Sequence, residues 1–467
     1  MQHNIGLFIF RRDLRIIDNT ALDEATKKCK KIYPIFIFTP DQVSNKNDYK
    51  SSNSIQFMIK SLDEVDKELR KRKSQLHYFY GDNDKVIKKL IRELNVNAIY
   101  FNKDYTPYSL KRDKMISKIC SKNKVECNTY DDVILIEDFN KVLSNSGTKY
   151  YFFTHFRNKA KKLTVRKPNK KYPKNLSKIV SDQKYQITDP SKFLINKKFY
   201  IKNKYIRVTG GRKEGKKILK NIKDFKSYDK TRNTPSKPTT TLSAHNHFGT
   251  VSIREVYYEF KEKLKNNSPL IDQLYWRDFY YYLGDHHPDM FNGKPIPAKK
   301  KYNKIKWKHN TSWFNKWKNG KTGFPIVDAG MREMNKTGFM HNRVRMIVSM
   351  FLIKGLIIDW RKGEKYFSQK LVDIDRTQNV GNWMWSASTG ADGQPWLRIF
   401  NPWSQGKRAD PSGDYIKKWI PELDNVDGKD LHKWDKKYID YPKIDYPKPI
   451  VDHATQRELA LKAYGDD

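Results

Sequence analysis

The stretch HNIGLFIFRRDLRIIDN, residues 3–19, sets the first constraint on the fold. Its apolar run, Ile5–Phe10, consists largely of β-branched and aromatic residues and predicts a buried strand. A dinucleotide-binding strand of the usual kind is followed by a glycine-rich loop, whereas RRDLRIIDN contains no glycine. The stretch therefore predicts an α/β sheet without the common phosphate-binding fingerprint.

Further apolar runs recur through the first 136 residues. They predict strands at Tyr33–Phe38, Leu76–Tyr80, Ala98–Phe101 and Val133–Ile136. Between the runs, apolar residues recur at helical spacing from Ile55 to Leu69 and from Val86 to Leu94. Alternating strands and helices predict a mostly parallel, Rossmann-like sheet that is covered by helices.

The rest of the chain has a different pattern. Residues 137–205 combine prolines, weak periodicity and a lysine cluster from Lys159 to Lys174, which predicts a long connector. Beyond it strand patterns vanish, and helices are predicted most clearly at Ile253–Leu264, Leu270–Leu283, Asp328–Thr337 and His341–Ile353. We predict an α/β domain at 1–136, a linker at 137–205 and an all-helical domain at 206–467.

Charge is the outstanding bulk property, because 93 Lys and Arg against 52 Asp and Glu leave a net charge of +41. Such a surface is typical of proteins that bind nucleic acid. A lysine-rich coding bias is the alternative, and composition does not separate the two. Three scattered cysteines and the lack of a membrane-length apolar stretch predict a soluble intracellular protein, nuclear or cytoplasmic, with no membrane partner. We expect a monomer.

Polar and aromatic side chains gather in the predicted helical domain. All 11 tryptophans lie beyond residue 275, where they either fill the core or stack on planar ligands. In HNRVRM (341–346), Asn342, Arg345 and Met346 share one helix face. TTTLSAH (239–245) suits either a helix cap or a phosphate. Histidine spacing predicts no metal site.

Four blocks carry a resemblance to a known family. They are FRRDLRIIDN (10–19), WKNGKTGFPIVDAGMREMNKTGFMHNRVRM (317–346), IDWRKGEKYF (358–367) and VGNWMWSASTGADGQPWLRIFNP (380–402). Through them the chain resembles the DNA photolyase/cryptochrome family, and within it the class I cyclobutane pyrimidine dimer photolyases. The resemblance covers nearly the whole chain. It implies an FAD inside the helical domain, a light-driven DNA repair reaction and ultraviolet-damaged DNA as the partner.

The resemblance also implies the flavin contacts. By position these are Tyr228, Thr239, Thr240, Thr241, Leu242, Ser243, Gln273, Arg277, Arg345, Asp373, Asp375 and Asn379. Asn379 matches the position that faces the central-ring nitrogen of the flavin, where photolyases resemble one another in having an amide. A neutral amide accepts a hydrogen bond there without adding charge, which favours repair over signalling.

Electron transfer and DNA binding are implied in the same way. Trp307, Trp360 and Trp383 match the electron-transfer triad of the family, although buried packing is the alternative for each. The DNA contacts implied are Arg232, Trp276, Arg277, Tyr280, Asn342, Arg343, Met346, Trp385 and Gln405. Trp276 and Trp385 would stack on a flipped-out dimer.

The chain departs from the family pattern in two places, at Gln273 and at the pair Tyr108 and Ser109. Asn342 and Met346 match the dimer enzymes, whereas Gln273 stands where these carry a glutamate and is common in the (6-4) photoproduct branch. We assign Gln273, Asn342 and Met346 to the catalytic set and expect dimer repair. A (6-4) photolyase and a cryptochrome-like photoreceptor remain the alternatives. Tyr108 and Ser109 stand where the folate-binding members carry an Asn-Glu pair, which argues against folate. The antenna chromophore is left unassigned, and a deazaflavin, a second flavin or no antenna are the open alternatives.

Overall fold

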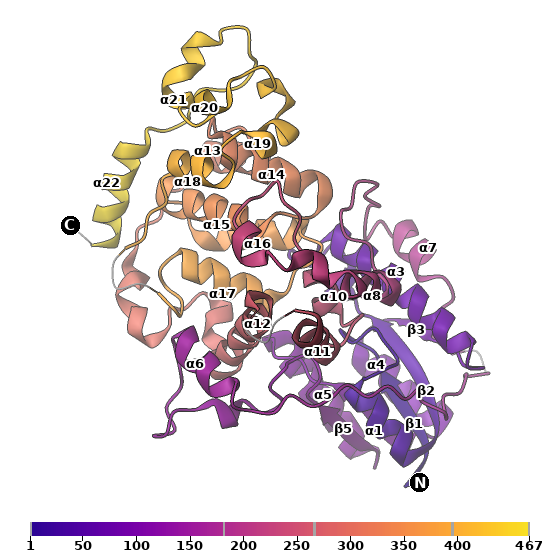
Figure 1. Ribbon diagram of the computed structural model, residues 1–467. Helices are drawn as coiled ribbons and strands as arrows, with labels where there is room; N and C mark the ends of the chain where they lie inside the picture. Colours follow the sequence, from indigo (N-terminus) through magenta and orange to yellow (C-terminus); the bar gives the residue numbers. More distant parts are fainter. Residues whose placement is uncertain (1, 181–182, 265–267, 394–396, 466–467) are drawn as a thin grey trace.

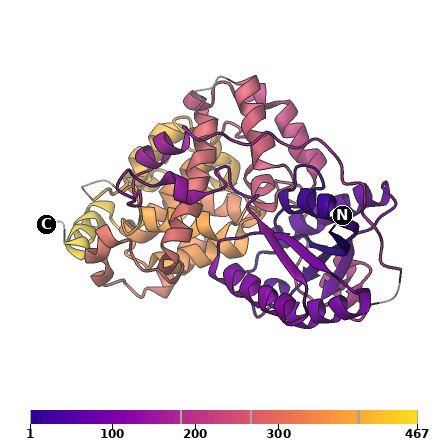
Figure 2. The same ribbon diagram turned by 90° about the horizontal axis from the view of Figure 1, so that it is seen from below.

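The computed structural model describes residues 2–180, 183–264, 268–393 and 397–465. Residues 394–396, which belong to the motif at 380–402, lie outside the described residues. Two units lie against each other in both views, an α/β unit that holds the N-terminus and a helical unit that ends at α22 (Figure 1, Figure 2). The predicted fold class, a parallel sheet domain followed by a helical domain, is confirmed.

Six described strands form one sheet in the order β5-β4-β1-β2-β3-β6. They are β1 (His3–Ile9), β2 (Cys29–Phe38), β3 (His77–Tyr80), β4 (Ala98–Asn102), β5 (Glu126–Tyr130) and β6 (Gln186–Ile187). All pairings are parallel except that of β3 with β6, which is antiparallel. The helices of this unit are α1 (Thr20–Lys28), α2 (Pro40–Val43), α3 (Ser52–Arg70), α4 (Asn83–Leu94) and α5 (Pro107–Lys122).

The remaining helices follow in chain order. The chain segment that connects the two units contains α6 (Phe153–Ala160) and α7 (Pro190–Asn196). The helical unit contains α8 (Arg212–Lys220), α9 (Tyr228–Thr231), α10 (Ser243–Phe248), α11 (Ile253–Lys263), α12 (Pro269–His286), α13 (Thr311–Asn319), α14 (Pro325–Thr337), α15 (Asn342–Met350), α16 (Trp360–Lys370), α17 (Arg376–Ser386), α18 (Pro402–Ala409), α19 (Asp414–Trp419), α20 (Gly428–Leu431), α21 (Trp434–Lys437) and α22 (His453–Tyr464). A short π-helix, Phe351–Gly355, continues α15.

The strand predicted at Val133–Ile136 is wrong. This apolar run forms a bend that is buried in the core of the helical unit. The carboxylate of Asp278 on α12 accepts hydrogen bonds from the backbone N–H of Leu135 at 2.7 Å and Ile136 at 2.9 Å. Buried backbone donors need a partner, and here a side chain supplies it instead of a neighbouring strand. The fifth parallel strand is the upstream segment β5.

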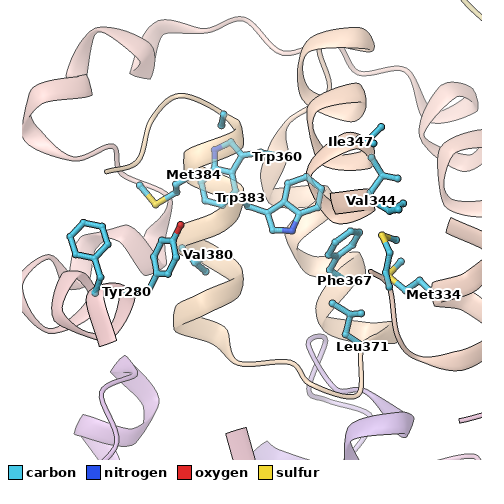
Figure 3. Close-up of a cluster of buried hydrophobic side chains, with 14 of the residues drawn as sticks. Tyr280, Met334, Val344, Ile347, Trp360, Phe367, Leu371, Val380, Trp383 and Met384 are labelled. Carbon is cyan, nitrogen blue, oxygen red and sulfur yellow. The ribbon is translucent and has the colours of Figure 1, made fainter. Parts of the chain in front are cut away.

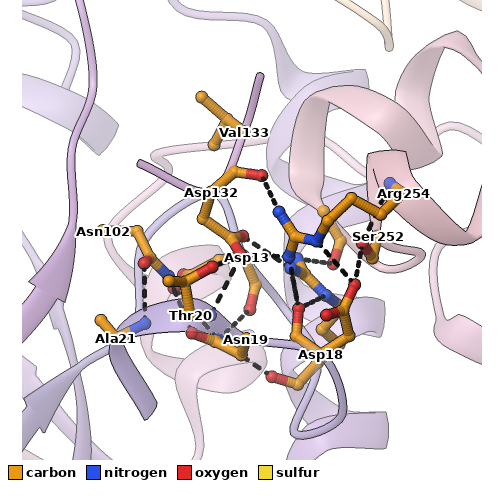
Figure 4. A network of polar contacts seen from close by, with 12 residues as sticks. Asp13, Asp18, Asn19, Thr20, Ala21, Asn102, Asp132, Val133, Ser252 and Arg254 are labelled. Atoms are coloured by element: carbon orange, nitrogen blue, oxygen red, sulfur yellow. Dashed lines mark hydrogen bonds and ion pairs between the residues drawn. The ribbon is translucent and has the colours of Figure 1, made fainter. Parts of the chain in front are cut away.

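The opening motif joins the two units through buried ion pairs (Figure 4). Arg254 on α11 contacts Asp18 at 2.9 Å and Asp132 at 2.7 Å, and Arg15 contacts Asp132 at 2.6 Å. Burial alone would raise the pKa of Asp132, but the two guanidinium groups hold it below its ordinary value. A capping box between Ser252 and Glu255 begins α11 and fixes the backbone that carries Arg254. RRDLRIIDN therefore connects the two units.

Candidate active site

A cavity of about 110 Å³ in the helical unit brings together eight residues that the sequence assigns to the site. They come from α15, from α17 and from the turn between α16 and α17. The eight are Asn342, Arg345, Met346, Asp373, Asp375, Asn379, Trp383 and Trp385. Residues predicted to contact the flavin, residues predicted to contact the lesion and Trp383 of the predicted triad thus line the same cavity.

One wall of the cavity carries a charge pair. The Arg345 Nη2 lies 2.9 Å from one carboxylate oxygen of Asp373 and 3.1 Å from the other. The Arg345 Nε donates to the backbone oxygen of Met340 at 2.8 Å, which fixes the plane of the guanidinium. The Asp373 side chain is 3% exposed and that of Arg345 is 26% exposed. The pair therefore offers a positive edge to the cavity.

Asp375 connects the cavity to the α/β unit. Its Oδ1 accepts from the backbone N–H of Thr377 at 3.0 Å and so caps α17. Its Oδ2 lies 3.2 Å from Arg12 Nη1 and 3.2 Å from His247 Nδ1, and it also accepts from the Tyr281 hydroxyl. Burial alone would raise the pKa of Asp375, but the charge of Arg12 and the bond to His247 hold it below its ordinary value. Sequence reasoning missed Arg12 and His247.

Asn379 has a defined amide orientation. Its Nδ2 lies 2.8 Å from Glu364 Oε1, 3.0 Å from the Glu364 backbone oxygen and 3.0 Å from Ser368 Oγ. These three acceptors fix which atom of the Asn379 amide is the nitrogen. If the amide were turned over, its oxygen would face two oxygens of Glu364, neither of which can donate a hydrogen bond when the carboxylate is ionised. Among the described residues none donates to Asn379 Oδ1. Asn379 therefore keeps an acceptor for a ligand in the cavity.

Two tryptophans of the predicted triad, Trp360 and Trp383, lie in a buried apolar cluster (Figure 3), and Trp383 also lines the cavity. Trp383 is 2% exposed and Trp360 is 4% exposed. The third, Trp307, is half-buried and its ring lies 6.4 Å from that of Tyr464. Trp383 also lies 6.3 Å from the ring of Trp317, a neighbour that sequence reasoning did not single out. Exposure thus increases from Trp383 through Trp360 to Trp307.

Helix α12 carries the other predicted lesion contacts. Gln273, Trp276 and Tyr280 are three and four residues apart and share one helix face. The Gln273 amide lies 3.4 Å from the Pro269 oxygen of its own helix. Arg277 is 9% exposed and donates to the backbone oxygens of Val133 and Asn246. Arg277 is therefore held by backbone oxygens of the bend at 133–136 and of α10.

Residues 239–242 precede α10, and Ser243 is its first residue. Leu242 is the residue before the helix and makes no side-chain capping hydrogen bond, so of the two alternatives for this segment the side-chain helix cap is not formed. Thr241 has a φ of 54° and its hydroxyl donates to the Thr240 oxygen at 2.7 Å. Thr239 is half-buried and Ser243 is exposed. Upstream, Tyr228 is half-buried beneath the guanidinium of Arg232, which lies 5.7 Å from its ring.

Arginines converge beside the cavity. Burial and the neighbouring charges of Arg232, Arg408 and Arg398 lower the pKa of Arg343. Arg343 also donates to Asn233 Oδ1, at 2.6 Å from Nη2. Sequence reasoning identified Arg232 and Arg343 but missed Arg398 and Arg408. The half-buried Gln405 lies one helical turn before Arg408 on α18. Positive charges that lie this close repel one another, and bound phosphate groups would neutralise that repulsion.

A second cavity, of about 410 Å³, lies at the carboxyl ends of β1 and β2. Its walls include Arg12, Asp104, Tyr108, Ser109 and Arg112. Ligands of open α/β sheets bind at this edge. The buried Arg112 Nη2 and Arg12 Nε have no partner among the described residues. The donor set therefore fits an anionic or polar ligand.

Among the described residues there is no cluster of three or more His, Cys, Asp and Glu side chains that suits a metal ion. Their helices include none with the length and apolar character needed to span a membrane. Fold and cavities together define a two-unit protein with one polar cavity inside its helical unit and another at the edge of its sheet.

Comparisons with known proteins define the family. The model of the FAD binding domain of DNA photolyase matches residues 270–466, and the DNA photolyase model matches residues 7–174. A deoxyribodipyrimidine photo-lyase of Buchnera aphidicola subsp. Acyrthosiphon pisum is 37% identical over 99% of this chain and 97% of its own. The chain belongs to the DNA photolyase/cryptochrome family.

Solved structures agree over the full length. An archaeal photolyase from Sulfolobus tokodaii, described with two FAD molecules, is 39% identical with a TM-score of 0.87 and covers 99% of this chain and 100% of its own. A bacterial class III photolyase from Agrobacterium tumefaciens is 31% identical with a TM-score of 0.89 and covers 100% of this chain and 98% of its own.

Proposed function

We propose that this protein is a deoxyribodipyrimidine photo-lyase that splits flipped-out cyclobutane pyrimidine dimers in DNA under blue light. The observation that carries the proposal is the 110 Å³ cavity, in which the predicted flavin contacts and lesion contacts share one set of walls. When bound, reduced FAD supplies the light-excited electron that opens the dimer. Splitting a dimer into two pyrimidines is redox-neutral, so the reaction needs no net reductant.

The donor set of the cavity fits a flavin ring. Asn379 holds its Oδ1 free for an N–H donor and adds no charge. Arg345, held by Asp373, places a positive charge where negative charge gathers on a reduced ring. Asp375 fixes the start of α17, which carries Asn379. These residues bind and orient the group, and the implied contacts at Tyr228, 239–243, Gln273 and Arg277 are proposed on the resemblance.

We assign lesion binding to Asn342, Met346 and Trp385, which line this cavity, and to Trp276, which lies outside its lining on α12. Trp276 on α12 and Trp385 on α17 supply rings for stacking on an extruded dimer. Asn342 offers an amide to thymine edges, and Met346 offers an apolar, polarisable contact. Neither residue is an acid, which favours the dimer over the (6-4) photoproduct. Gln273 would offer an amide to the lesion, where the glutamate of the dimer enzymes would offer a carboxyl group.

The arginine cluster supports DNA binding. Arg232, Arg398 and Arg408 lie close enough to Arg343 that their charges, after burial, lower its pKa. Phosphates that flank the lesion would relieve this repulsion. The net charge of +41 then reflects a polyanionic partner.

We propose that the 410 Å³ cavity holds the antenna chromophore. Arg12 and Arg112 have unpartnered donors there, which suits a phosphate-bearing or otherwise polar chromophore. Tyr108 and Ser109 line the cavity, so the residues that differ from the folate pattern face the ligand. The second FAD of the Sulfolobus tokodaii relative favours a second flavin over folate.

Several finer assignments belong to the same proposal. We place the protein in class I on the resemblance of Asn342 and Met346 to the dimer enzymes, and a class III enzyme is the alternative. We keep the domain limits 1–136, 137–205 and 206–467, the monomeric state and the triad Trp307, Trp360 and Trp383 as proposals. A cryptochrome-like photoreceptor is disfavoured by the amide at Asn379.

The decisive comparison uses two substrates. Purified protein with reduced FAD is given one DNA that carries cyclobutane dimers and another that carries (6-4) photoproducts, each under blue light. Loss of the dimers alone supports the proposal. Loss of the (6-4) photoproducts alone would move the protein to that branch, and loss of neither would favour the photoreceptor.

A further inference from the structure

The segment that connects the two units touches both aromatic walls of the proposed lesion pocket. It contributes Tyr151, and then Phe153 at the start of α6. Helix α6 packs along α12, which carries Trp276 (Figure 1). Neither Tyr151 nor Phe153 belongs to the site residues discussed above.

Phe153 braces the first wall. Its ring stacks on the indole of Trp276 with centroids 3.7 Å apart and planes inclined by 12°. Phe153 itself is 5% exposed, whereas Trp276 is half-buried. One face of the indole is therefore covered by a buried ring, while part of Trp276 stays accessible. A ring held in this way cannot rotate freely.

Asp392 connects the same segment to the second wall. Its Oδ1 accepts from the backbone N–H of Phe153 at 2.9 Å, and its own N–H donates to the Tyr151 oxygen at 2.8 Å. Its backbone oxygen accepts from Trp385 Nε1 at 3.2 Å. Asp392 has a φ of 56°, a left-handed conformation that Asp and Asn tolerate better than other non-glycine residues. The loop after α17 is thus fixed to the connector and to Trp385 at once.

We propose that Phe153 and Asp392 are positioning residues that set the gap between Trp276 and Trp385. The inference rests on the proposed lesion-binding function. Two rings bind a lesion more tightly when their separation is already fixed in the free protein. The side chains then lose less conformational entropy on binding. The connector is then part of the lesion site, and it acts through the two tryptophans.

The first test compares two phenylalanines of α6. Phe153→Leu removes the stack on Trp276. Phe156→Leu is the matched control, because Phe156 is also buried but its ring contacts Phe279 and Tyr282 instead. Binding in the dark is measured with an oligonucleotide that carries one dimer and with its undamaged counterpart, and FAD content is measured by visible absorption.

Phe153→Leu should weaken binding of the dimer oligonucleotide by roughly three- to tenfold, the value of one aromatic pair. Binding of the undamaged oligonucleotide and the FAD content should stay at wild-type level. Phe153→Tyr, which keeps the ring, should restore dimer binding. Equal preference for the dimer in Phe153→Leu and Phe156→Leu would overturn the inference.

The second test addresses Asp392. Asp392→Ala removes the acceptor for the Phe153 N–H, whereas Asp392→Asn keeps an oxygen there and tolerates the same backbone conformation. The alanine variant should lose dimer preference and the asparagine variant should keep it. Equal dimer preference in both variants would overturn the role of the side chain. A wild-type protein with no preference for the dimer would overturn the proposed function itself, and the inference with it.

Discussion

Replacing Asn379 by aspartate tests the amide orientation on which the flavin assignment depends. In the wild-type protein the Nδ2 of Asn379 lies 2.8 Å from Glu364 Oε1 and 3.0 Å from Ser368 Oγ. Aspartate at this position replaces the donor with an oxygen that faces the Glu364 carboxylate. Asn379 is 9% exposed and Glu364 is 2% exposed, so water does not screen the contact well.

The size of the effect follows from the distance. Two carboxylate oxygens 2.8 Å apart repel each other by about 6 kcal/mol at an effective dielectric constant of about 20. Repulsion of that size keeps one proton on the pair at neutral pH. Burial already raises the pKa of Glu364 in the wild-type protein, and the second carboxylate adds to this shift.

The proton shared by the two carboxylates decides how the free energy of unfolding of Asn379→Asp changes with pH. The folded variant binds it more tightly than the unfolded chain does. Its stabilising contribution is therefore complete below the unfolded pKa and is lost as the pH rises toward the folded pKa. The free energy of unfolding of Asn379→Asp should fall relative to wild type by up to about 1.4 kcal/mol per pH unit above roughly pH 5.

Urea unfolding followed by tryptophan fluorescence, repeated from about pH 5 to about pH 8, measures this difference. The double variant Asn379→Asp with Glu364→Gln is the control, because it restores one donor and one acceptor with their sides exchanged. It should show no added pH dependence. If Asn379→Asp followed the wild-type profile, the Nδ2 would not face Glu364, and the assignment of Oδ1 to the cavity would fail.

Three further predictions concern other parts of the molecule. Trp383→Phe should abolish light-driven reduction of bound flavin and spare dimer repair by chemically reduced protein; retained photoreduction would remove Trp383 from the path. DNA binding should weaken steeply with salt, and Arg343→Gln should lower the slope of log K against log salt by about one; an unchanged slope would exclude a phosphate contact. Asp132→Asn should destabilise the protein by about 3–5 kcal/mol in urea unfolding, because two buried arginines lose a shared carboxylate; a change below about 1 kcal/mol would contradict the role of Asp132 in joining the two units.

The fold was predictable where local pattern and burial agree. The strands β1 to β4 are apolar runs buried in the sheet. Their length and their content of β-branched and aromatic residues identify them from the sequence. Val133–Ile136 has the same local pattern, but its burial comes from the helical unit through Asp278. The strand β5, with the sequence ECNTY, is half-buried at the sheet edge and has no apolar signal. Its pairing with β4 decides its structure.

The site was predictable where its residues lie close together in the sequence. The α15 face with Asn342, Arg345 and Met346 follows from helical spacing alone, and the structure places it opposite Asp373. Contacts across long separations were missed for a physical reason. Arg12 reaches Asp375 across 363 positions, and no local pattern marks such a partner.

The same applies to the lesion walls. Phe153 stands in a lysine-rich connector of weak periodicity, and only the packing of α6 on α12 brings it to Trp276. Arg398 and Arg408 join Arg343 only when α18 and the preceding segment fold beside α15. The sequence shows which residues have reactive or charged side chains, whereas tertiary packing decides which residues those side chains contact.

The central claim is tested most directly by following cyclobutane dimers in ultraviolet-irradiated DNA mixed with the purified protein carrying reduced FAD. One sample is exposed to blue light, and its duplicate is kept in the dark. We predict that dimers disappear only in the illuminated sample and are replaced by intact pyrimidines. Persistence of the dimers under light, or equal loss in the dark, would contradict the account.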